Sequence, residues 1–365
     1  MPGTCTFIGA ALAYLIGSGF ASGQEIMQYF VPFGKNAIAA AGLTALILIT
    51  ANSGFAYAGE KCGDNKDAIF VFFAGPKAGK IFCWLTAAFA LLSYVVMLAG
   101  AGSALNQQYG LPLWTGVAAM TIFTVITVCL GLNKLVNIIS RIGPFLAALV
   151  LFTGIVTLLH NSSSLPENLQ LINEGRIALL KSANKWWLSA LLNGGMNLLI
   201  MSGLMAELGE EYGAKKIMAG QSIGVLLYAS ICLLMAFALI SVLPQITGTQ
   251  IPNLVLAAGL SPALAAVFGI IIFAAVFTTA CPLLWTAASR INREKSWRYS
   301  LTVLLMAGSG SLLALAVPFA TLVNRIFVAE GLVGIILFFF ICRKLLLDFV
   351  KRKIKRIMKD NKDPW

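Results

Sequence analysis

Residues 17–25 read GSGFASGQE, in the middle of a hydrophobic run that is otherwise long enough to cross a membrane. Three glycines, two serines, an amide and a carboxylate lie where a spanning helix would reach the centre of the bilayer. An unpaired backbone group in hydrocarbon is costly, so a membrane helix breaks at this depth only where a ligand, an ion or water fills the gap. The stretch therefore predicts a broken first span that takes part in a binding site.

The composition is that of a helical integral membrane protein. Of the 365 residues, 59% are hydrophobic and 11% are charged, and the mean hydropathy is +0.87. A soluble domain carries roughly 25% charged residues, and apolar runs of ~20 residues are the length of spanning helices. We expect ten spans, at residues 4–32, 36–59, 79–104, 112–131, 133–160, 186–208, 212–243, 261–289, 296–316 and 318–342.

The net charge of +12 is placed in a way that argues against nucleic acid as a partner. Nine of the 26 Lys and Arg residues lie in the tail, residues 343–365, directly after the last apolar run. Apolar residues recur between them at helical spacing, which predicts an amphipathic helix along anionic lipid of the inner leaflet. With the N-terminus inside, 21 of the 26 basic residues face the cytoplasm. The positive-inside rule then places both termini there.

The chain divides into two halves of five spans, residues 1–160 and 186–342, which we expect to form one transporter domain ahead of the tail. The first span of the second half reads LNGGMN at residues 192–197, with its own glycine pair. Paired glycine-interrupted spans in two halves indicate an inverted-repeat transporter, and an odd number of spans in each half requires opposite topology. The alternative is that the glycines serve helix packing.

This pattern resembles the LeuT-type fold of the amino acid–polyamine–organocation superfamily, an all-α fold of ten transmembrane helices. That fold is a 5+5 inverted repeat with helices 1 and 6 unwound at mid-membrane. The GSGFASGQE stretch is similar to the bacterial YkvI-type membrane proteins, which are described as amino-acid permeases. The resemblance implies a secondary active transporter of a small solute, an amino acid or a related amine. It would work by alternating access in the bacterial cytoplasmic membrane.

The expected substrate site lies around the two breaks. Backbone N–H groups at the starts of half-helices favour a carboxylate, and the neighbouring amides can bind other polar atoms of a zwitterion. Tyr94 on span three is either an aromatic cap on the site, as the resemblance implies, or a core residue. The candidate substrate residues are Gly19, Ser22, Gly23, Gln24, Tyr94, Asn193, Gly194, Gly195 and Asn197.

Span eight carries two adjacent hydroxyls, Thr278 and Thr279. A desolvated sodium ion needs about five or six oxygen ligands, which hydroxyls and freed carbonyls supply without added charge. The resemblance implies that Ala275 and these threonines face the carbonyls of Gly17 and Phe20 in a sodium site. The alternative is that both threonines bond carbonyls of their own helix. Apart from sodium as a coupling ion, we expect no cofactor.

Four of the charged residues in the spans are candidates for a gate or for proton transfer. An intramembrane carboxylate indicates function, so Glu25 either pairs with a cation, binds a substrate cation or carries a proton. Its expected partner in an outer gate is Arg325, with Glu330 as the rival on the same span. Arg141 lies ~13 Å into span five. It either replaces the sodium ion or extends to the inner surface. A proton-coupled or uncoupled exchanger that uses Arg141 or Glu25 therefore stays open.

Other function classes have less support. The sequence contains no GxxxxGK[ST] motif, so ATP is not the expected energy source. A nucleophile–base pair or metal cluster is also missing from the pattern, and the single histidine, His160, ends a span. We therefore expect no enzyme. A transporter-like sensor that binds solute without net flux remains an alternative, and the sequence sets no oligomeric state.

Overall fold

The computed structural model describes residues 3–63, 68–131, 136–294 and 296–360, and all their side chains except 18, 136–144, 352 and 355–360. Within these residues, eight helices are long and apolar enough to cross a membrane. A ninth span is formed if the pair Phe145–His160 and Ser162–Asn173, bent by 69°, counts as one. The chain is a multi-pass membrane protein.

The helices follow one another with short connections. They are α1 (Thr4–Leu15), α2 (Ser18–Ser22), α3 (Gln24–Tyr29), α4 (Ala37–Cys62), α5 (Ala68–Tyr109), α6 (Leu113–Leu130), α7 (Val136–His160), α8 (Leu165–Asn173), α9 (Trp186–Tyr212), α10 (Ala214–Ser241), α11 (Leu243–Ile246), α12 (Pro252–Leu260), α13 (Pro262–Ser289), α14 (Trp297–Ala316), α15 (Phe319–Leu322) and α16 (Val328–Asp360). Two 3₁₀ turns, Val31–Asn36 and Ser162–Ser164, and one π-helical turn, Val323–Phe327, lie between them.

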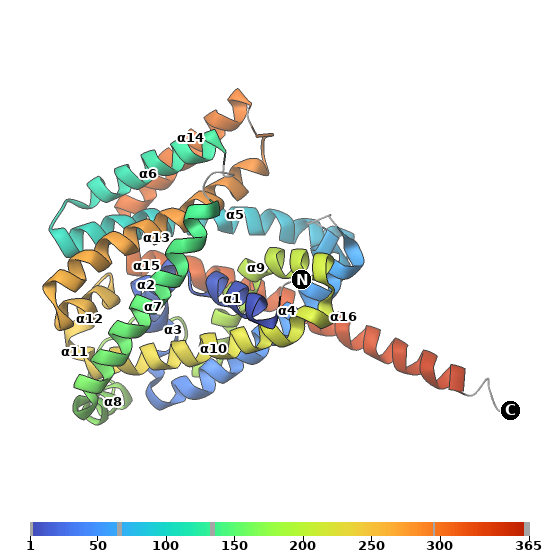
Figure 1. Cartoon of the computed structure of the whole chain (residues 1–365), viewed down its shortest axis with the longest axis horizontal. Coiled ribbons are helices and arrows are strands. Elements are labelled where there is room, and N and C mark those ends of the chain that lie inside the picture. The colour runs from blue at the N-terminus through green and yellow to red at the C-terminus, as the bar shows by residue number, and fades with distance from the viewer. Residues whose placement is uncertain (1–2, 64–67, 132–135, 295, 361–365) are drawn as a thin grey trace.

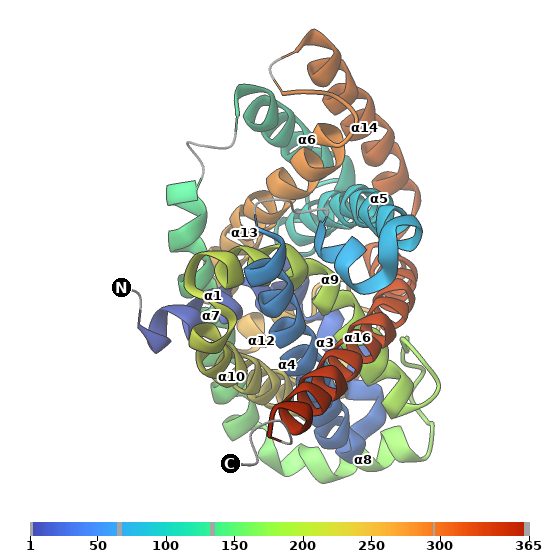
Figure 2. The same cartoon turned by 90° about the vertical axis from the view of Figure 1, so that its right-hand side faces the viewer.

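The helices pack in two groups, with the broken first span between them (Figures 1 and 2). Helices α1, α4, α9 and α10 form one group, and α5, α6, α13 and α14 form the other. Both groups are contacted by α7 and α16. The short helix α2 contacts α5 and α13, whereas α3 contacts α9 and α10. Residues 17–25 therefore lie at the boundary between the two helix groups.

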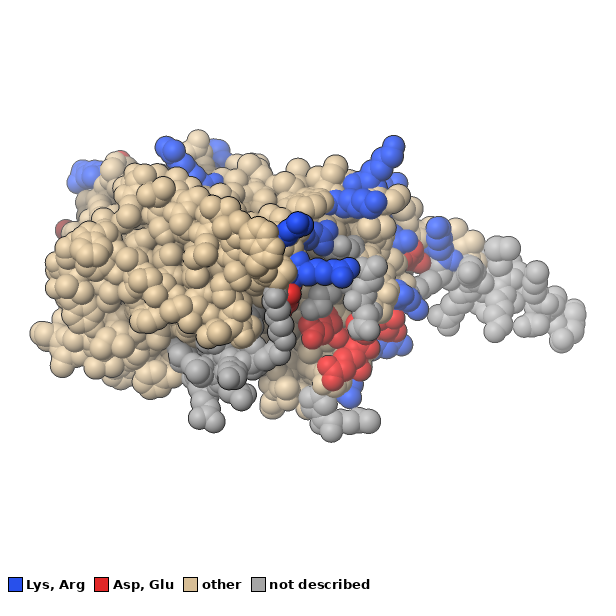
Figure 3. Space-filling view, turned by 90° about the horizontal axis from the view of Figure 1, so that it is seen from above, with Lys and Arg blue, Asp and Glu red and all other residues tan. Residues whose placement is uncertain are grey.

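The two ends of the bundle differ. One end of the bundle carries α8, α11 and α12, and we call it the α12 face (Figure 1). The end of α16 projects from the opposite end, which we call the tail face. The helix α12 forms within the uncharged segment 244–260 and packs on α2 and α13. In Figure 3, most of the visible surface carries no charge, as expected of a surface that meets lipid.

The first span is interrupted at two places. Helix α1 ends at Leu15, Ile16 leaves the helical region with ψ 71°, and Gly17 is extended. One short turn later, Gly23 adopts φ +85°, a left-handed conformation that glycine enters without steric cost. The chain then resumes as α3. This geometry frees backbone groups in the middle of the bundle.

The prediction that span six is unwound at Gly194-Gly195 is wrong. Helix α9 runs without a break from Trp186 to Tyr212. A Cβ on Gly195 would lie 2.3 Å from the carbonyl oxygen of Gly331, and one on Gly194 would lie 2.9 Å from the Ile47 side chain. The glycine pair therefore lets α9 approach α16 and α4 closely, which is the packing role that small residues often have between membrane helices.

The tail does not begin as a separate element. Helix α16 continues from the last span through residue 360 and projects away from the bundle (Figure 1). The expected boundary at residues 342 and 343 is therefore inside one helix, and residues 361–365 lie outside the described ones. Contact of this helix with anionic lipid stays a prediction.

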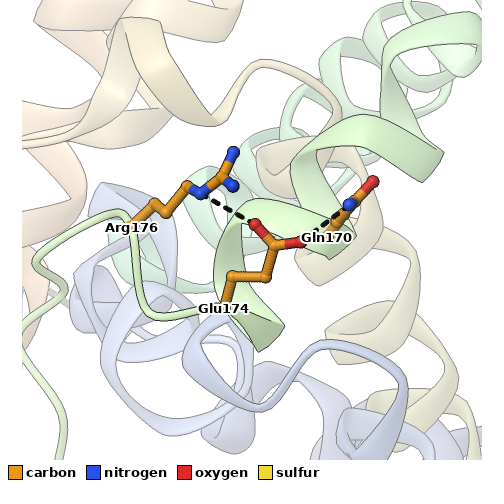
Figure 4. A network of polar contacts seen from close by, with 3 residues as sticks. All are labelled: Gln170, Glu174 and Arg176. Carbon is orange, nitrogen blue, oxygen red and sulfur yellow. Dashed lines mark hydrogen bonds and ion pairs between the residues drawn. The ribbon is translucent and has the colours of Figure 1, made fainter.

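The connection after span five forms the short helix α8. At its C-terminal end, Gln170 and Arg176 both bind the carboxylate of Glu174, at 2.7 and 2.8 Å (Figure 4). The Arg176 side chain is 68% exposed, so this ion pair adds little to stability. It lies at the start of the connection that leads toward α9.

Candidate functional site

The centre of the candidate site is the carboxylate of Glu25, on the second residue of α3. Its side chain is buried, with only 5% of its surface exposed. Its Oε1 accepts hydrogen bonds from Asn193 Nδ2 at 2.9 Å, Tyr228 OH at 3.1 Å and Asn197 Nδ2 at 3.4 Å. Three donors from α9 and α10 thus hold this oxygen, and hydrogen bonds to a charged group are each worth about 1.5–3 kcal/mol.

The structure brings together predicted residues from the two halves. Asn193 and Asn197 lie one turn apart on α9, and Asn197 Nδ2 also donates to the Asn193 carbonyl at 3.0 Å. Both amides therefore reach Glu25 from an intact helix, so no break in α9 is needed to present them. Their glycine neighbours Gly194 and Gly195 pack against other helices instead.

A second buried carboxylate, Glu330, lies on α16 and is also 5% exposed. Ser93 Oγ on α5 donates to its Oε2 at 3.4 Å. The two carboxylates are close enough to interact electrostatically. The expected gate partner Arg325 lies in the π-helical turn with an exposed side chain, and the structure records no ion pair between it and Glu25. The electrostatic neighbour of Glu25 among the two expected partners is therefore the acid Glu330 and not the cation Arg325.

Side chains satisfy part of the backbone that the break leaves free. Ser22 Oγ donates to the Gly19 carbonyl at 2.7 Å and accepts from Gln24 N at 3.2 Å. On α12, Asn253 Nδ2 donates to the carbonyls of Phe20 at 3.3 Å and Ala21 at 2.9 Å. Helix α12 thus covers the break and binds it directly.

Because Gly19 and Gly23 have no side chain, neighbouring side chains can approach this turn closely from two sides. A Cβ on Gly19 would lie 3.4 Å from the Phe327 ring and 3.6 Å from Glu25 Oε2. A Cβ on Gly23 would lie 2.6 Å from Asn253 Oδ1. The first glycine therefore faces the buried carboxylate, and the second faces the amide of α12.

A chain of amides, which we call the amide network, closes the α12 face above the break. Gln24 Nε2 donates to the Thr249 carbonyl at 2.7 Å, and Gln28 Nε2 donates to Gln24 Oε1 at 3.0 Å and to the Ala320 carbonyl at 2.9 Å. Asn324 Nδ2 donates to Gln28 Oε1 at 3.0 Å. The network joins α3 to the connection before α12 and to α15 with its π-helical turn.

Two further glutamines extend the amide network. Gln107 at the end of α5 pairs with Ile251, donating to its carbonyl and accepting from its N–H, each at 2.9 Å. Gln250 Oε1 accepts from the N–H of Ala320 at 2.9 Å. The network therefore consists of Gln24, Gln28, Gln107, Gln250 and Asn324.

A small cavity lies beside the break. It has an empty volume of about 190 Å³ and is lined by Ser22, Met97, Gly100, Ile251, Ile272, Val276 and Phe319. This space is contracted compared with ligand pockets, which usually measure about 300–1,000 Å³, because no water-sized sphere fits inside it. Of the predicted substrate residues, Ser22 alone lines it.

The predicted sodium ligands make local hydrogen bonds here. Thr278 and Thr279 both donate to the Ala275 carbonyl of their own helix, at 2.8 and 3.2 Å. The Gly17 carbonyl accepts from Ala21 N at 3.0 Å, and the Phe20 carbonyl accepts from Gly23 N at 3.0 Å as well as from Asn253. An ion at this place would have to share these oxygens with their present donors.

Two other predicted residues lie away from Glu25 or outside the described side chains. The Tyr94 hydroxyl is 2.9 Å from Thr124 Oγ1 on α6, in the core position that the sequence also allowed. Arg141 is part of α7, but its side chain is not among the described ones.

Sequence reasoning missed several residues that the structure places at the site. Tyr228 is the one tyrosine of the apolar helix α10, and Ser93 directly precedes Tyr94. Asn253 follows Pro252 at the start of α12. The signal in the sequence for Tyr228 and Ser93 is that each is a polar side chain within an apolar span.

Comparisons with known proteins identify relatives of unassigned function. No protein-family profile matches the sequence. The uncharacterized protein YyaD of Bacillus subtilis (strain 168) is 31% identical over 144 residues, 39% of this chain and 41% of YyaD. The uncharacterized membrane protein YkvI of the same organism is 24% identical over 278 residues, 73% of this chain and 74% of YkvI. The chain thus matches less than half the length of YyaD.

Solved structures give the architecture. The inward-facing conformation of Mhp1 superposes with a TM-score of 0.68 at 15% identity, over 91% of this chain and 73% of Mhp1. The structure of MhsT in complex with L-phenylalanine superposes with a TM-score of 0.59 at 17% identity, over 92% of this chain and 87% of MhsT. The chain has the LeuT-type fold. Within it, the interrupted first span meets a continuous α9 at the buried carboxylate of Glu25.

Proposed function

We propose that the protein is a secondary transporter that moves a small solute across the membrane by alternating access. The observation that carries the proposal is the first span, which is interrupted between two helix groups and presents a buried carboxylate at the interruption. Membrane transporters place substrate and ion sites at such broken helices, because freed backbone groups there bind ligand. The LeuT-type architecture is consistent with this proposal.

We propose a solute with an amino group, either an amine or an amino acid. Glu25 offers a negative charge, and Asn193 Oδ1 is a buried acceptor with no hydrogen-bond partner among the described residues. An ammonium group carries only donors and would be satisfied by such oxygens. The carboxylate of an amino acid would need donors, which the amides of Asn197 and Gln24 would supply once their present hydrogen bonds to Glu25, the Asn193 carbonyl and the Thr249 carbonyl separate.

The amide network supports a conformation closed at the α12 face. In the proposed orientation, with both termini in the cytoplasm of a bacterium, this face is the outer one. The contracted cavity beside the break fits the same closed state. Solute entry from that side would then require the network and the Asn253 contacts to separate, after which the break would be open to solute.

Sodium is the proposed coupling ion at the Thr278, Thr279 and Ala275 position opposite Gly17 and Phe20. The support comes from the sequence resemblance, because the hydroxyls bond within their own helix in this conformation. Replacing both threonines with alanine should abolish any dependence of solute flux on a sodium gradient. Unchanged dependence in that variant would remove the assignment.

Flux in proteoliposomes tests the transporter proposal directly. Purified protein is reconstituted, and uptake of labelled amino acids and amines is measured with sodium, proton or no gradient. Glu25→Gln should reduce uptake at least tenfold, whereas Glu167→Gln, which changes an exposed carboxylate on α8, should leave it unchanged. Proton dependence, or exchange without a gradient, would favour the alternative exchanger. Solute binding without flux under every gradient would leave the sensor alternative and exclude transport.

A further inference from the structure

A second cavity lies at the α12 face, lined by residues of α7, α11, α12 and α13. Its volume is about 700 Å³, which is within the range of about 300–1,000 Å³ that ligand pockets usually have. The helices α7, α12 and α13 pack on one another around it. Its lining residues do not include any residue that binds Glu25 or belongs to the amide network. The proposed transport function therefore leaves this cavity unused.

The lining of the cavity changes from apolar to polar along α7. Phe152, Val156 and His160 line it at intervals of four residues, which places them on one face of the helix. Phe152 and His160 are therefore ~12 Å apart along the helix axis, at a rise of ~1.5 Å per residue. Half of the hydrocarbon core of a bilayer measures ~15 Å. The cavity thus has nearly the depth of one leaflet, with its polar end at the end of the helix.

The apolar part of the cavity continues into an exposed apolar surface. On α7, Phe145, Phe152 and Leu159 recur every seven residues and are 59%, 53% and 72% exposed. On α13, Leu264 lines the cavity, and Val267 three residues later is 53% exposed. Exposed apolar patches of this kind on spans mark contact with the membrane. Because Phe152 belongs both to this surface and to the lining, a lipid chain can enter the cavity sideways from the bilayer.

Uncharged polar groups form the rim of the cavity at the end of α7. His160 Nδ1 lies 2.9 Å from the Val156 carbonyl oxygen, and Asn161 Nδ2 donates to the Thr157 carbonyl at 3.0 Å. The described residues that line the cavity include no lysine, arginine, aspartate or glutamate. Anionic lipid headgroups are bound by clusters of lysine and arginine. The rim therefore fits a zwitterionic headgroup better than an anionic one.

Helix α12 connects this cavity with the break in the first span. Asn253 donates to the carbonyls of Phe20 and Ala21 at the break, whereas Leu256 and Gly259 of the same helix line the cavity. A Cβ on Gly259 would have nothing within 4 Å, so this side of α12 faces open space. The cavity exists in the conformation in which α12 covers the break. A molecule that binds the cavity of this conformation favours it over others.

We propose that the cavity binds one acyl chain of a phospholipid from the leaflet at the α12 face, with the zwitterionic headgroup at the rim beside His160 and Asn161. The bound chain packs against α12 and holds it over the break. No covalent bond forms or breaks. The site does not depend on the proposed transport function, because lipid can occupy it whether or not solute is moved.

Photolabelling of the purified full-length protein tests the site. The probe is a phosphatidylcholine that carries a diazirine in one acyl chain, added in trace amounts to protein in detergent, and mass spectrometry locates the label after irradiation. We expect label on Leu256 and Val242, which line the cavity and are only 2% and 6% exposed. Lipid on the outer surface does not reach such buried side chains. Leu46 on α4, which is 62% exposed, reports lipid bound at the general surface.

Filling the cavity should remove the label. Gly259→Phe places a ring in the open space, so label on Leu256 and Val242 should fall roughly tenfold while label on Leu46 stays unchanged. Gly308→Phe is the matched control, because this exposed glycine of α14 also has nothing within 4 Å of its Cβ position. It should keep the label of the wild type. Gly259→Leu fills less space, should lose less label, and replaces Gly259→Phe if that variant does not fold.

Three outcomes would overturn the lipid site. The first is label on Leu46 without label on Leu256 and Val242, or equal label on these two in the wild type and the Gly259 variants. The second is loss of the label with excess L-leucine but not with excess unlabelled phosphatidylcholine, which would show a solute site. The third is stronger competition by phosphatidylglycerol than by phosphatidylcholine, which would contradict the zwitterionic headgroup. None of these outcomes depends on solute flux.

Hydrogen–deuterium exchange tests the effect of the bound chain on α12. Adding phosphatidylcholine to the protein in detergent should slow exchange in residues 254–260 of the wild type and of Gly308→Phe. In Gly259→Phe the ring already fills the cavity, so exchange there should be slow before lipid is added and should not change. Equal slowing by lipid in Gly259→Phe would show that lipid acts at another surface and would overturn the link to α12.

Discussion

At the scale of single residues, two glycines of the break differ in backbone conformation and in the space around them. Gly23 is held at φ +85° against Asn253, whereas Gly17 has φ −88° and ψ −172° and open space where a Cβ would lie. The sequence shows the two as equivalent members of one glycine-rich stretch. Only the backbone conformation and the contact with α12 distinguish them.

Gly23→Ala should destabilise the protein, whereas Gly17→Ala should not. An alanine at position 23 would enter a left-handed conformation that costs about 1–2 kcal/mol for a residue with a Cβ. Its Cβ would also lie 2.6 Å from Asn253 Oδ1, so α12 would have to shift. The measurement is the unfolding temperature in detergent. A fall in Tm for Gly17→Ala as large as that for Gly23→Ala would contradict this division.

Part of the site was predictable at this scale because its residues are unusual for a membrane span. Glu25 and the amides Asn193 and Asn197 are polar groups in apolar runs, and the structure brings the three together. Asn253 was not predictable, because it lies in a connection, and only the folded chain places it against the break. Glu330 was named only as the rival partner of Glu25, whereas the expected cation, Arg325, is exposed and the structure records no ion pair between it and Glu25.

At the scale of elements, the glycine pair in α9 illustrates a limit of pattern reasoning. A break and a close helix contact both call for glycine, and the sequence cannot distinguish them without knowledge of the opposing surface. Here Gly331 and Gly334 on α16 oppose Gly195, and a Cβ on Gly334 would lie 1.9 Å from the carbonyl oxygen of Gly195. Glycines on both sides of the contact allow the continuous helix α9 to approach α16 closely.

Gly195→Ala should therefore weaken the α9–α16 contact and lower stability. Its Cβ would overlap the Gly331 carbonyl, and overpacking of this kind typically costs about 1–3 kcal/mol. Gly203, on the same helix, has nothing within 4 Å of its Cβ position and an exposed surface. Gly203→Ala should keep or raise stability, since alanine favours a helix by about 1 kcal/mol over glycine. Thermal unfolding of both variants decides, and an equal Tm for the two would refute the packing role.

At the scale of the whole molecule, the sequence predicted the helical membrane class and the position of the main spans. The span ends differ by a few residues because apolar composition does not mark where a helix caps. The bend of α5 at Gly75-Pro76 and the unbroken passage of α16 into the tail depend on local backbone geometry. The amide network lay beyond prediction, because it joins residues separated by more than 200 positions in the chain.

The amide network should control which face of the molecule is open. Gln28→Ala removes the partner of Gln24 Oε1, the Ala320 carbonyl and Asn324 Nδ2 together, and each buried group left unpaired costs about 1–3 kcal/mol. We expect faster hydrogen–deuterium exchange in residues 247–260 and 318–325, which lie on the α12 face. Gln245→Ala, which shortens an exposed amide on α11, is the matched control and should exchange like the wild type.

The exchange of α1, which reaches the tail face, distinguishes alternating access from simple loosening. In alternating access, opening at the α12 face is linked to closing at the tail face, so exchange in Thr4–Leu15 should slow as exchange in residues 247–260 accelerates. Faster exchange at both faces of Gln28→Ala would mean that the network only stabilises the fold. Unchanged exchange in residues 247–260 would mean that Asn253 alone holds α12 over the break, because that contact does not pass through Gln28.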